Sequence, residues 1–281
     1  MGKHHALRHL IRMTQIALLP HRGVVELTGP DRVAFLNGLV SNDIAKADLQ
    51  AAVWAALLTP QGRYLFDFFV FADETRLLLE LARQDIPALV EKLRRFKLRA
   101  DVEIAESSEN FQVYAIWQGT PPQAPLTAAD PRLPEAGYRC LISGTMTCSA
   151  TAQDYAAHRI RLGLPDSAPD LESGKTLLLE AGFDELHGID WKKGCYMGQE
   201  LTARTKYRGL VKRRLVPVTV TEPAPPVGTP ILADGQEVGS LRSSAGLHAL
   251  AMLQVSALQH PLFINDLPIK VHRPGWMNQP A

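Results

Sequence analysis

The segment 64–71 constrains the fold more than any other part of the sequence. It reads Tyr-Leu-Phe-Asp-Phe-Phe-Val-Phe, so seven of its eight positions are apolar, without the alternation that a solvent-facing strand shows. A β-strand of this composition has to be covered on both faces, which predicts a layered structure built around it. Its single charge, Asp67, needs a partner, a shifted pKa or a ligand, unless it lies at a strand edge where it meets water or an arginine.

The segments around this strand predict an antiparallel α+β layer. Residues 85–97 form an amphipathic helix, because their apolar side chains recur at helical spacing. Short apolar runs bounded by turn residues predict strands at 23–29, 53–59, 76–82, 102–105 and 111–117. Adjacent strands flanking a single helix favour a ferredoxin-like or related arrangement.

A further helix is predicted over 31–40, with Asn42 and Asp43 as its stop signal. Asn37, Asn42 and Asp43 are polar residues in an otherwise apolar stretch. They serve either as capping and turn residues or as part of a site, and the sequence favours neither.

Between residues 118 and 214 the pattern is mixed. It predicts an irregular loop at 119–134, a short strand at 138–142 and a helix at 151–162. A flexible acidic loop at 166–174 and a strand at 177–182 that ends in a glycine turn are expected to follow. After Arg214 the pattern changes to short strands separated by Gly and Pro, at 215–221, 230–232, 237–242, 249–255 and 267–271. Regular short strands of this kind predict a small β-barrel.

Composition excludes several classes of protein. The chain has 281 residues and a formal net charge of +1, so no global field draws it to nucleic acid or to a membrane surface. No apolar run approaches the roughly 20 residues that span a bilayer. The three cysteines form no CxxC pair and no zinc spacing, which favours a reducing compartment and predicts neither a disulfide nor a stably bound metal. The basic residues 1–12 are expected to be a disordered tail.

The most distinctive motif surrounds Cys195. The run Lys-Gly-Cys-Tyr-Met-Gly-Gln-Glu begins at Lys193 and places this cysteine beside two lysines, just before a predicted helix over 199–206. Lysines and a helix N-terminus both stabilise a thiolate, which predicts a reactive thiol. The alternative is a small residue packed in a tight glycine loop.

Seven residues of this run resemble the signature of the YgfZ family, namely Lys193, Gly194, Cys195, Tyr196, Gly198, Gln199 and Glu200. That family is similar to the T-protein, the aminomethyltransferase of the glycine cleavage system, and includes a mitochondrial iron–sulfur assembly factor. The resemblance implies an α+β ring of three subdomains around tetrahydrofolate, with a ferredoxin-like layer and a C-terminal β-barrel. The expected division is 1–12 as a tail, 13–50 with 118–212 as a discontinuous folate-binding domain, 51–117 as the ferredoxin-like subdomain and 213–281 as the barrel.

The resemblance also implies site residues. Glu180 matches the carboxylate that recognises the pterin, since one carboxylate can accept two parallel hydrogen bonds. The stretch 62–67 resembles the region that carries paired catalytic aspartates, but Phe66 replaces one of them and only Asp67 remains. Asp67 is therefore expected to line the folate cavity and to contribute to catalysis, while the missing aspartate counts against aminomethyl transfer.

The segment 204–214 contains six basic residues in eleven positions. Arg204, Lys206 and Arg208 are expected to bind the anionic tail of folate, with RNA phosphates or a solvated linker face as alternatives. The reactive thiol has three possible roles: a nucleophile that carries a one-carbon or sulfur group, a transient iron–sulfur ligand, or a redox-sensing thiol.

The resemblance implies a tetrahydrofolate-binding protein that supports iron–sulfur cluster assembly or maintenance in client enzymes, including radical enzymes that modify tRNA. The partners would be client or assembly proteins, folate and, more weakly, tRNA, with no membrane. The compartment would be the cytoplasm, or the mitochondrial matrix in a eukaryote. The alternatives are a folate-dependent aminomethyl or one-carbon transferase and a non-catalytic module that binds folate or tRNA.

Overall fold

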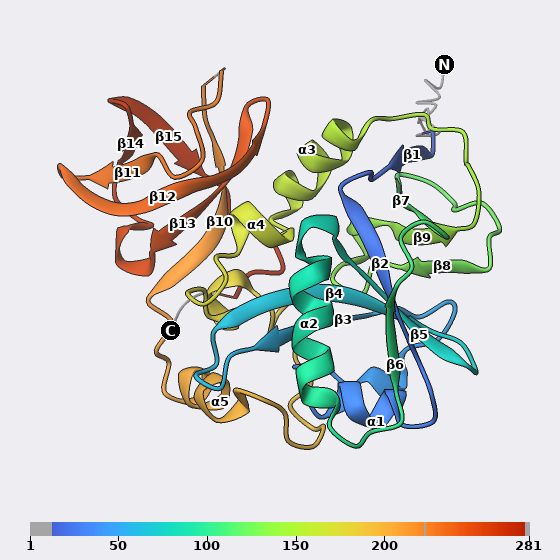
Figure 1. The fold of residues 1–281 in the computed structure, drawn as a ribbon. Helices are drawn as coiled ribbons and strands as arrows, with labels where there is room; N and C mark the ends of the chain where they lie inside the picture. Colours follow the sequence, from blue (N-terminus) through green and yellow to red (C-terminus); the bar gives the residue numbers. More distant parts are fainter. Residues whose placement is uncertain (1–12, 222, 279–281) are drawn as a thin grey trace, which may run out of the picture.

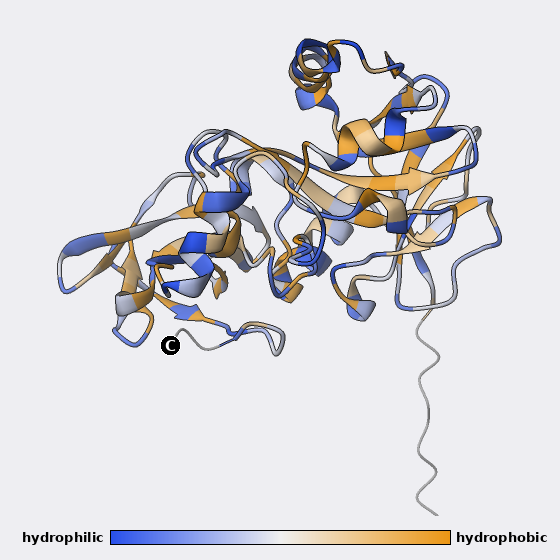
Figure 2. Cartoon of the chain, turned by 90° about the horizontal axis from the view of Figure 1, so that it is seen from below, coloured by the Kyte–Doolittle hydropathy of each residue, from blue (hydrophilic) through white to orange (hydrophobic). Residues whose placement is uncertain are grey.

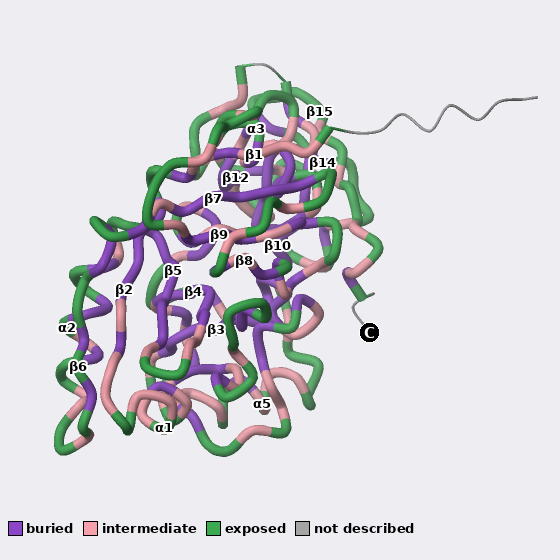
Figure 3. Tube along the Cα trace, turned by 90° about the vertical axis from the view of Figure 1, so that its right-hand side faces the viewer, coloured by how far each residue is buried: buried purple, intermediate pink, exposed green. Residues whose placement is uncertain are grey.

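Two antiparallel sheets and a closed barrel organise the chain (Figure 1). The structure is a computed structural model that describes residues 13–221 and 223–278, so the expected tail 1–12 lies outside the described residues. Figure 2 shows that hydrophobic residues concentrate along the strands. Figure 3 shows the same strands as largely buried, whereas the segments around α1 and α5 are partly exposed.

The larger sheet has five strands in the order β3-β4-β5-β2-β6. Their bounds are β2 (Arg22–Thr28), β3 (Val53–Leu58), β4 (Tyr64–Ala72), β5 (Arg76–Ala82) and β6 (Glu103–Glu106). The apolar strand β4 is covered on both faces, as predicted. Phe68 packs in the core beneath helix α2 (Ile86–Lys97), and Phe69 packs in the core shared with the second sheet.

The second sheet has four strands in the order β1-β7-β9-β8. Their bounds are β1 (Gln15–Leu18), β7 (Gln112–Trp117), β8 (Leu126–Ala129) and β9 (Tyr138–Ile142). Strand β8 corrects the prediction that residues 119–134 form only an irregular loop, and β1 was not predicted. Helix α3 (Ala152–Leu162) follows this sheet and begins at a capping box between Thr151 and Asp154.

The C-terminal barrel is closed, as predicted, with the strand order β10-β13-β12-β11-β14-β15. Its strands are β10 (Arg213–Thr219), β11 (Pro230–Ala233), β12 (Gln236–Ala245), β13 (His248–Gln254), β14 (Leu262–Ile264) and β15 (Leu267–Val271). Trp276 follows the barrel and docks back on α3, where its indole N–H donates to the carbonyl oxygen of Leu162 at 2.8 Å.

Sheet pairing divides residues 13–212 differently from the expected subdomain boundaries. Strand β2 lies in the five-stranded sheet, although 13–50 was assigned to the other domain, because it pairs with β5 along its whole length. Strand β7 lies in the four-stranded sheet, although it was assigned to 51–117, because it pairs with β1 and β9. These pairings join segments that are distant in sequence, so turn signals could not reveal them.

Two predicted elements have different bounds. Helix α1 (Arg32–Asn37) ends at Asn37 and not at residue 40, because the Asn37 side chain turns to accept a hydrogen bond from the backbone N–H of Ile44 at 2.9 Å. Asp43 likewise accepts from Ala45 and caps the short 3₁₀ helix η1 (Ile44–Lys46).

The expected strand 177–182 is instead the 3₁₀ helix η4 (Leu178–Ala181), which ends at Gly182 with a left-handed φ of 76°. The expected loop 166–174 contains the short helix α4 (Ser167–Asp170), and Asp170 is fully buried. The remaining 3₁₀ helices are η2 (Arg83–Asp85), η3 (Pro134–Ala136) and η5 (Val255–Ala257).

Candidate functional site

Cys195 lies on the loop that leads into helix α5 (Gln199–Tyr207), and this loop runs between α1 and α5 in Figure 1. It is an exposed free cysteine. A Cβ placed on Gly194 would meet no atom within 4 Å, so the residue before the thiol has free space beside it. The next residue, Tyr196, is only 6% exposed and packs in the core. The Cys195 thiol is therefore accessible, and the residue that follows it is fixed in the core by its aromatic ring.

The Lys193 ammonium donates its hydrogen bonds away from the Cys195 thiol. The acceptors are the carbonyl oxygens of Asn37, Val40 and Asn42 at 2.7, 2.7 and 2.8 Å. An ammonium has three N–H donors, so none remains for Cys195. Burial lowers the pKa of Lys193 to about 8 against the opposing effect of two nearby aspartates.

Further bonds join the base of the thiol loop to the segment after α1. The Asn42 side chain donates to the carbonyl oxygen of His187 at 2.7 Å, and the Ser41 hydroxyl donates to that of Gly188 at 2.7 Å. The backbone N–H of Asp190 donates to the carbonyl oxygen of Ser41 at 3.0 Å. The Asn42 side chain therefore bonds to the base of the thiol loop and also makes a local turn bond, in which its oxygen accepts from the backbone N–H of Asp43 at 2.9 Å.

The second half of the motif builds the start of α5. Gly198 has a left-handed φ of 80°, and a Cβ there would lie 2.9 Å from the Cα of Gly62 in the β3–β4 turn. Only glycine fits this close approach. The Gln199 side chain accepts from the backbone N–H of Tyr196 at 3.4 Å, and Glu200 is exposed in the first helical turn.

Glu180 lies on η4 at the edge of a cleft of about 710 Å³. It is 4% exposed, and its carboxylate accepts from the backbone N–H of Leu177 at 3.2 Å. The Arg213 guanidinium donates two further bonds to it, each 3.1 Å long. The carboxylate that the resemblance assigns to a pterin is thus held by an arginine in this structure.

Asp67 is 2% exposed and lies in the interior of the fold. Its carboxylate accepts from three neutral donors, namely the Trp54 indole at 2.9 Å, the Tyr64 hydroxyl at 2.8 Å and the Ser167 hydroxyl at 2.9 Å. It therefore does not lie at a sheet edge, since β4 is flanked by β3 and β5, and its hydrogen-bond partners are neutral donors and not an arginine. Asp67 is not among the residues that line the Glu180 cleft, and Phe66 packs in the core on the α2 side of the sheet.

The three predicted tail-binding residues lie on or just after α5, outside that cleft. Arg204 and Arg208 are exposed. Lys206 pairs with Asp184 at 3.0 Å, and its ammonium lies 4.1 Å from the ring centroid of Trp191. The structure does not bring these residues to Glu180.

The cleft has its own basic residues, Arg63, Lys212 and Arg213. Sequence reasoning did not identify Arg63, whose guanidinium donates to the carbonyl oxygen of Lys175 at 2.7 Å. The turn signal at 60–63 marks its place in the chain, but only the packing of this turn against η4 and the barrel shows what Arg63 faces.

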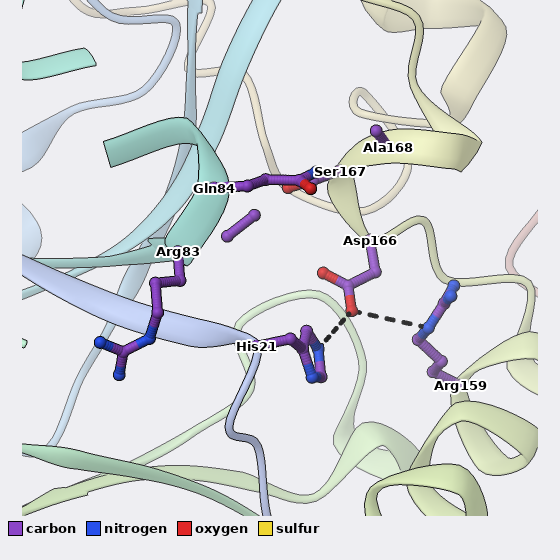
Figure 4. A pocket seen from close by; sticks show the side chains of 8 residues that line it. His21, Arg83, Gln84, Arg159, Asp166, Ser167 and Ala168 are labelled. Atoms are coloured by element: carbon purple, nitrogen blue, oxygen red, sulfur yellow. Dashed lines mark ion pairs between the residues drawn. The ribbon is translucent and has the colours of Figure 1, made fainter. Parts of the chain in front are cut away.

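A second cavity, of about 520 Å³, is lined by none of the predicted site residues (Figure 4). Asp166 stands at its centre and accepts from Arg22 at 2.6 Å, while Arg159 and His21 each lie 3.7 Å from its other oxygen. Burial alone would raise the pKa of Asp166, but the surrounding cations, Arg22 first, hold it well below its usual range. This cavity borders a buried network of ion pairs between the sheets.

The fold is that of an aminomethyltransferase. The crystal structure of the glycine cleavage system aminomethyltransferase T from Bartonella henselae matches it with a TM-score of 0.70, covering 96% of this chain and 89% of that chain at 14% sequence identity. This likeness establishes the architecture of sheets and barrel that the sequence resemblance implied.

The sequence comparisons then show the family. Residues 212–279 match the model of the CAF17 C-terminal β-barrel domain. The mouse iron–sulfur cluster assembly factor IBA57, a mitochondrial protein, is 31% identical over 88% of this chain and 79% of its own length. A mitochondrial IBA57 homolog of Mycosarcoma maydis is 37% identical over 73% of this chain, but the match spans only 57% of that relative. The chain therefore belongs to the IBA57 family of iron–sulfur cluster assembly factors.

Within residues 13–221 and 223–278, no helix has the length and apolar character needed to cross a membrane. In the same part of the chain, no group of three His, Cys, Asp or Glu side chains is placed to hold a metal ion. Cys140 is buried, and burial raises the pKa of its thiol, whereas Cys148 is exposed like Cys195.

Proposed function

We propose that this protein supports the assembly or maintenance of iron–sulfur clusters in client enzymes, with Cys195 as a transient thiolate ligand of the cluster in transit. The observation that carries the proposal is the accessible Cys195 thiol on a loop whose base is bonded to the segment after α1. Cysteine thiolates are the usual protein ligands of such clusters. The names of the IBA57 relatives support the same process.

A cluster held at Cys195 would be shared with a second protein. Such clusters usually take four protein ligands, and the described residues place no group of three metal-ligating side chains together. The partner, an assembly or client protein, would supply the remaining ligands. The cluster is then a substrate passed between proteins and not a resident cofactor of this chain.

Replacing Cys195 with serine tests this proposal, with Cys148→Ser as the matched exposed control. We expect Cys195→Ser to abolish rescue of iron–sulfur enzyme activity in cells that lack their own relative, and Cys148→Ser to rescue fully. Both variants should keep the thermal unfolding midpoint within about 2 °C, because both side chains are exposed. Full rescue by Cys195→Ser would reject the thiolate role.

We also propose that tetrahydrofolate or a derivative binds in the Glu180 cleft. Glu180 already accepts two parallel N–H bonds from Arg213, which is the pattern that a pterin amino and ring N–H pair would present. The cleft volume of about 710 Å³ suits a ligand of this size. Binding requires Arg213 to release the carboxylate. Arg63 and Lys212 would then attract the anionic tail, with Arg204, Lys206 and Arg208 beyond the cleft.

Titration of tetrahydrofolate at low and high salt tests the folate proposal. We expect saturable binding by the wild type, loss of binding in Glu180→Ala, and no change in Glu200→Ala, which removes an exposed acid of the same region. High salt should weaken binding, because it screens the basic residues at the tail. Absence of saturable binding at millimolar tetrahydrofolate would reject the proposal.

The finer functional assignment concerns clients and compartment. We propose that the clients include radical enzymes that modify tRNA, and that the protein works in a reducing compartment, which the free cysteines favour. Phe66 stands where a second aspartate would assist aminomethyl transfer, so a transferase activity is the weaker alternative. A methylene-tetrahydrofolate formation assay distinguishes the two.

A further inference from the structure

The ammonium of Lys193 sits in a cage of three carbonyl oxygens that belong to one short segment. Asn37 ends helix α1, and the last carbonyls of a helix have no partner within it. Val40 and Asn42 follow shortly after it. The carbonyl oxygens of these three residues all accept from Lys193, although they lie 151 to 156 positions before it in the sequence. One side chain thereby joins the thiol loop to the end of α1.

Burying an ammonium is unfavourable unless its donors are satisfied. All three N–H donors of Lys193 are satisfied, and the ring of Tyr196 lies 5.4 Å from its nitrogen. Asp43 and Asp190 are the charged groups that act on it, and both favour the charged form. This arrangement differs from that of Lys192, which is exposed.

The position of the thiol depends on anchors at either side of it. Gly194 has open space around it, and Cys195 is exposed, so neither residue is held by packing. Tyr196 holds the chain after the thiol through its buried ring. Before the thiol, the nearest side chain is that of Lys193, which is held by its three partly buried hydrogen bonds.

We propose that Lys193 is the positioning residue of the thiol loop: the carbonyl cage at the end of α1 fixes the direction in which Cys195 is presented to a partner. This inference rests on the proposed role of Cys195 in cluster transfer and adds the residue that holds it in place. It assigns to Lys193 a mechanical role and not that of a counter-charge for the thiolate.

A nitroxide attached to Cys195 in a Cys148→Ser background measures loop order directly, because the remaining cysteine, Cys140, is buried. We expect Lys193→Met to shift the electron paramagnetic resonance line shape from slow to fast motion. Lys192→Met, the neighbouring exposed lysine, should leave the line shape unchanged. An unchanged line shape in Lys193→Met would overturn the proposal, whatever the role of the thiol.

Rescue of iron–sulfur enzyme activity supplies the second readout. We expect Lys193→Met to lower it about tenfold or more, the usual effect of removing a group that orients a ligand, with the unfolding midpoint kept within about 4 °C. Equal losses of rescue activity in Lys193→Met and Lys192→Met would reject a specific role for the three carbonyls that bind Lys193. If Lys193→Met fails to fold, Lys193→Arg replaces it: its planar fork keeps the charge but cannot converge on three carbonyls, so the nitroxide should still gain mobility.

The two readouts separate this inference from the proposed function. If Cys195→Ser retains full rescue while Lys193→Met mobilises the nitroxide, the cage is correct and cluster handling by the thiol is wrong. If Cys195→Ser abolishes rescue and the nitroxide stays ordered in Lys193→Met, the thiol role is correct and the cage does not position it.

Discussion

Replacing Glu80 with glutamine is expected to lower the free energy of unfolding by about 3–5 kcal/mol, the usual effect of removing one partner from a buried ion pair. Glu80 is fully buried on β5, and one of its oxygens accepts from Arg22 at 2.5 Å and from Arg139 at 3.2 Å. Glutamine keeps the shape of the side chain but leaves two buried guanidiniums without this carboxylate. Denaturant unfolding at neutral pH measures the change.

Glu91→Gln is the matched control, because Glu91 pairs with Arg95 on the outer face of α2 with side chains 64% and 75% exposed. Loss of this ion pair should lower the free energy of unfolding by less than about 0.5 kcal/mol, since exposed pairs of this spacing contribute little. A loss below about 1 kcal/mol in Glu80→Gln would contradict the first prediction. It would mean that Asp130 and Asp166 are enough to compensate the buried arginines.

Asp67→Asn is expected to lower the free energy of unfolding by about 2–3 kcal/mol, the range for hydrogen bonds to a charged group. One Asp67 oxygen accepts from Tyr64 and Ser167, and the other accepts from the Trp54 indole. An asparagine that keeps the first two bonds turns its amide donor toward the indole donor. Calorimetric or denaturant unfolding of the variant measures the loss.

Tyr64→Phe is the graded control, since it deletes one of the three donors and should lower the free energy of unfolding by about 1.5 kcal/mol, the lower end of the range for a hydrogen bond to a charged group. The rescue activity assigned to Cys195 should persist in the folded fraction of Asp67→Asn, because Asp67 is buried and does not line the Glu180 cleft. A variant of normal stability without activity would contradict this structural role and restore the catalytic role that the resemblance implies.

Both carboxylates join layers of the fold. Arg22, Glu80 and Arg139 connect the two sheets, and the guanidinium of Arg139 lies 4.3 Å from the ring centroid of Phe69 on β4. Asp67 connects β4 to α4 through Ser167. These bonds connect the interior layers of the fold, whereas the exposed Cys195 thiol lies on a loop at the periphery, where a partner can reach it.

The sequence by itself determined the elements whose signals are local. Apolar runs and helical spacing correctly predicted β4, α2 and most of the barrel strands, because one strand or helix needs only its own residues to show its pattern. The closed barrel followed from short strands between Gly and Pro turns. The run around Cys195 pointed to the thiol loop for the same reason: its residue types are contiguous.

Only the tertiary structure decided which distant segments form hydrogen bonds with one another. The strand expected at 177–182 is the 3₁₀ helix η4, since Glu180 turns back to its own backbone and to Arg213. Asp67 receives its three donors from β3, β4 and α4, and Lys193 finds its carbonyls about 150 residues earlier. Hydrogen bonds between segments so far apart depend on how the sheets and loops pack, and no local pattern encodes that packing.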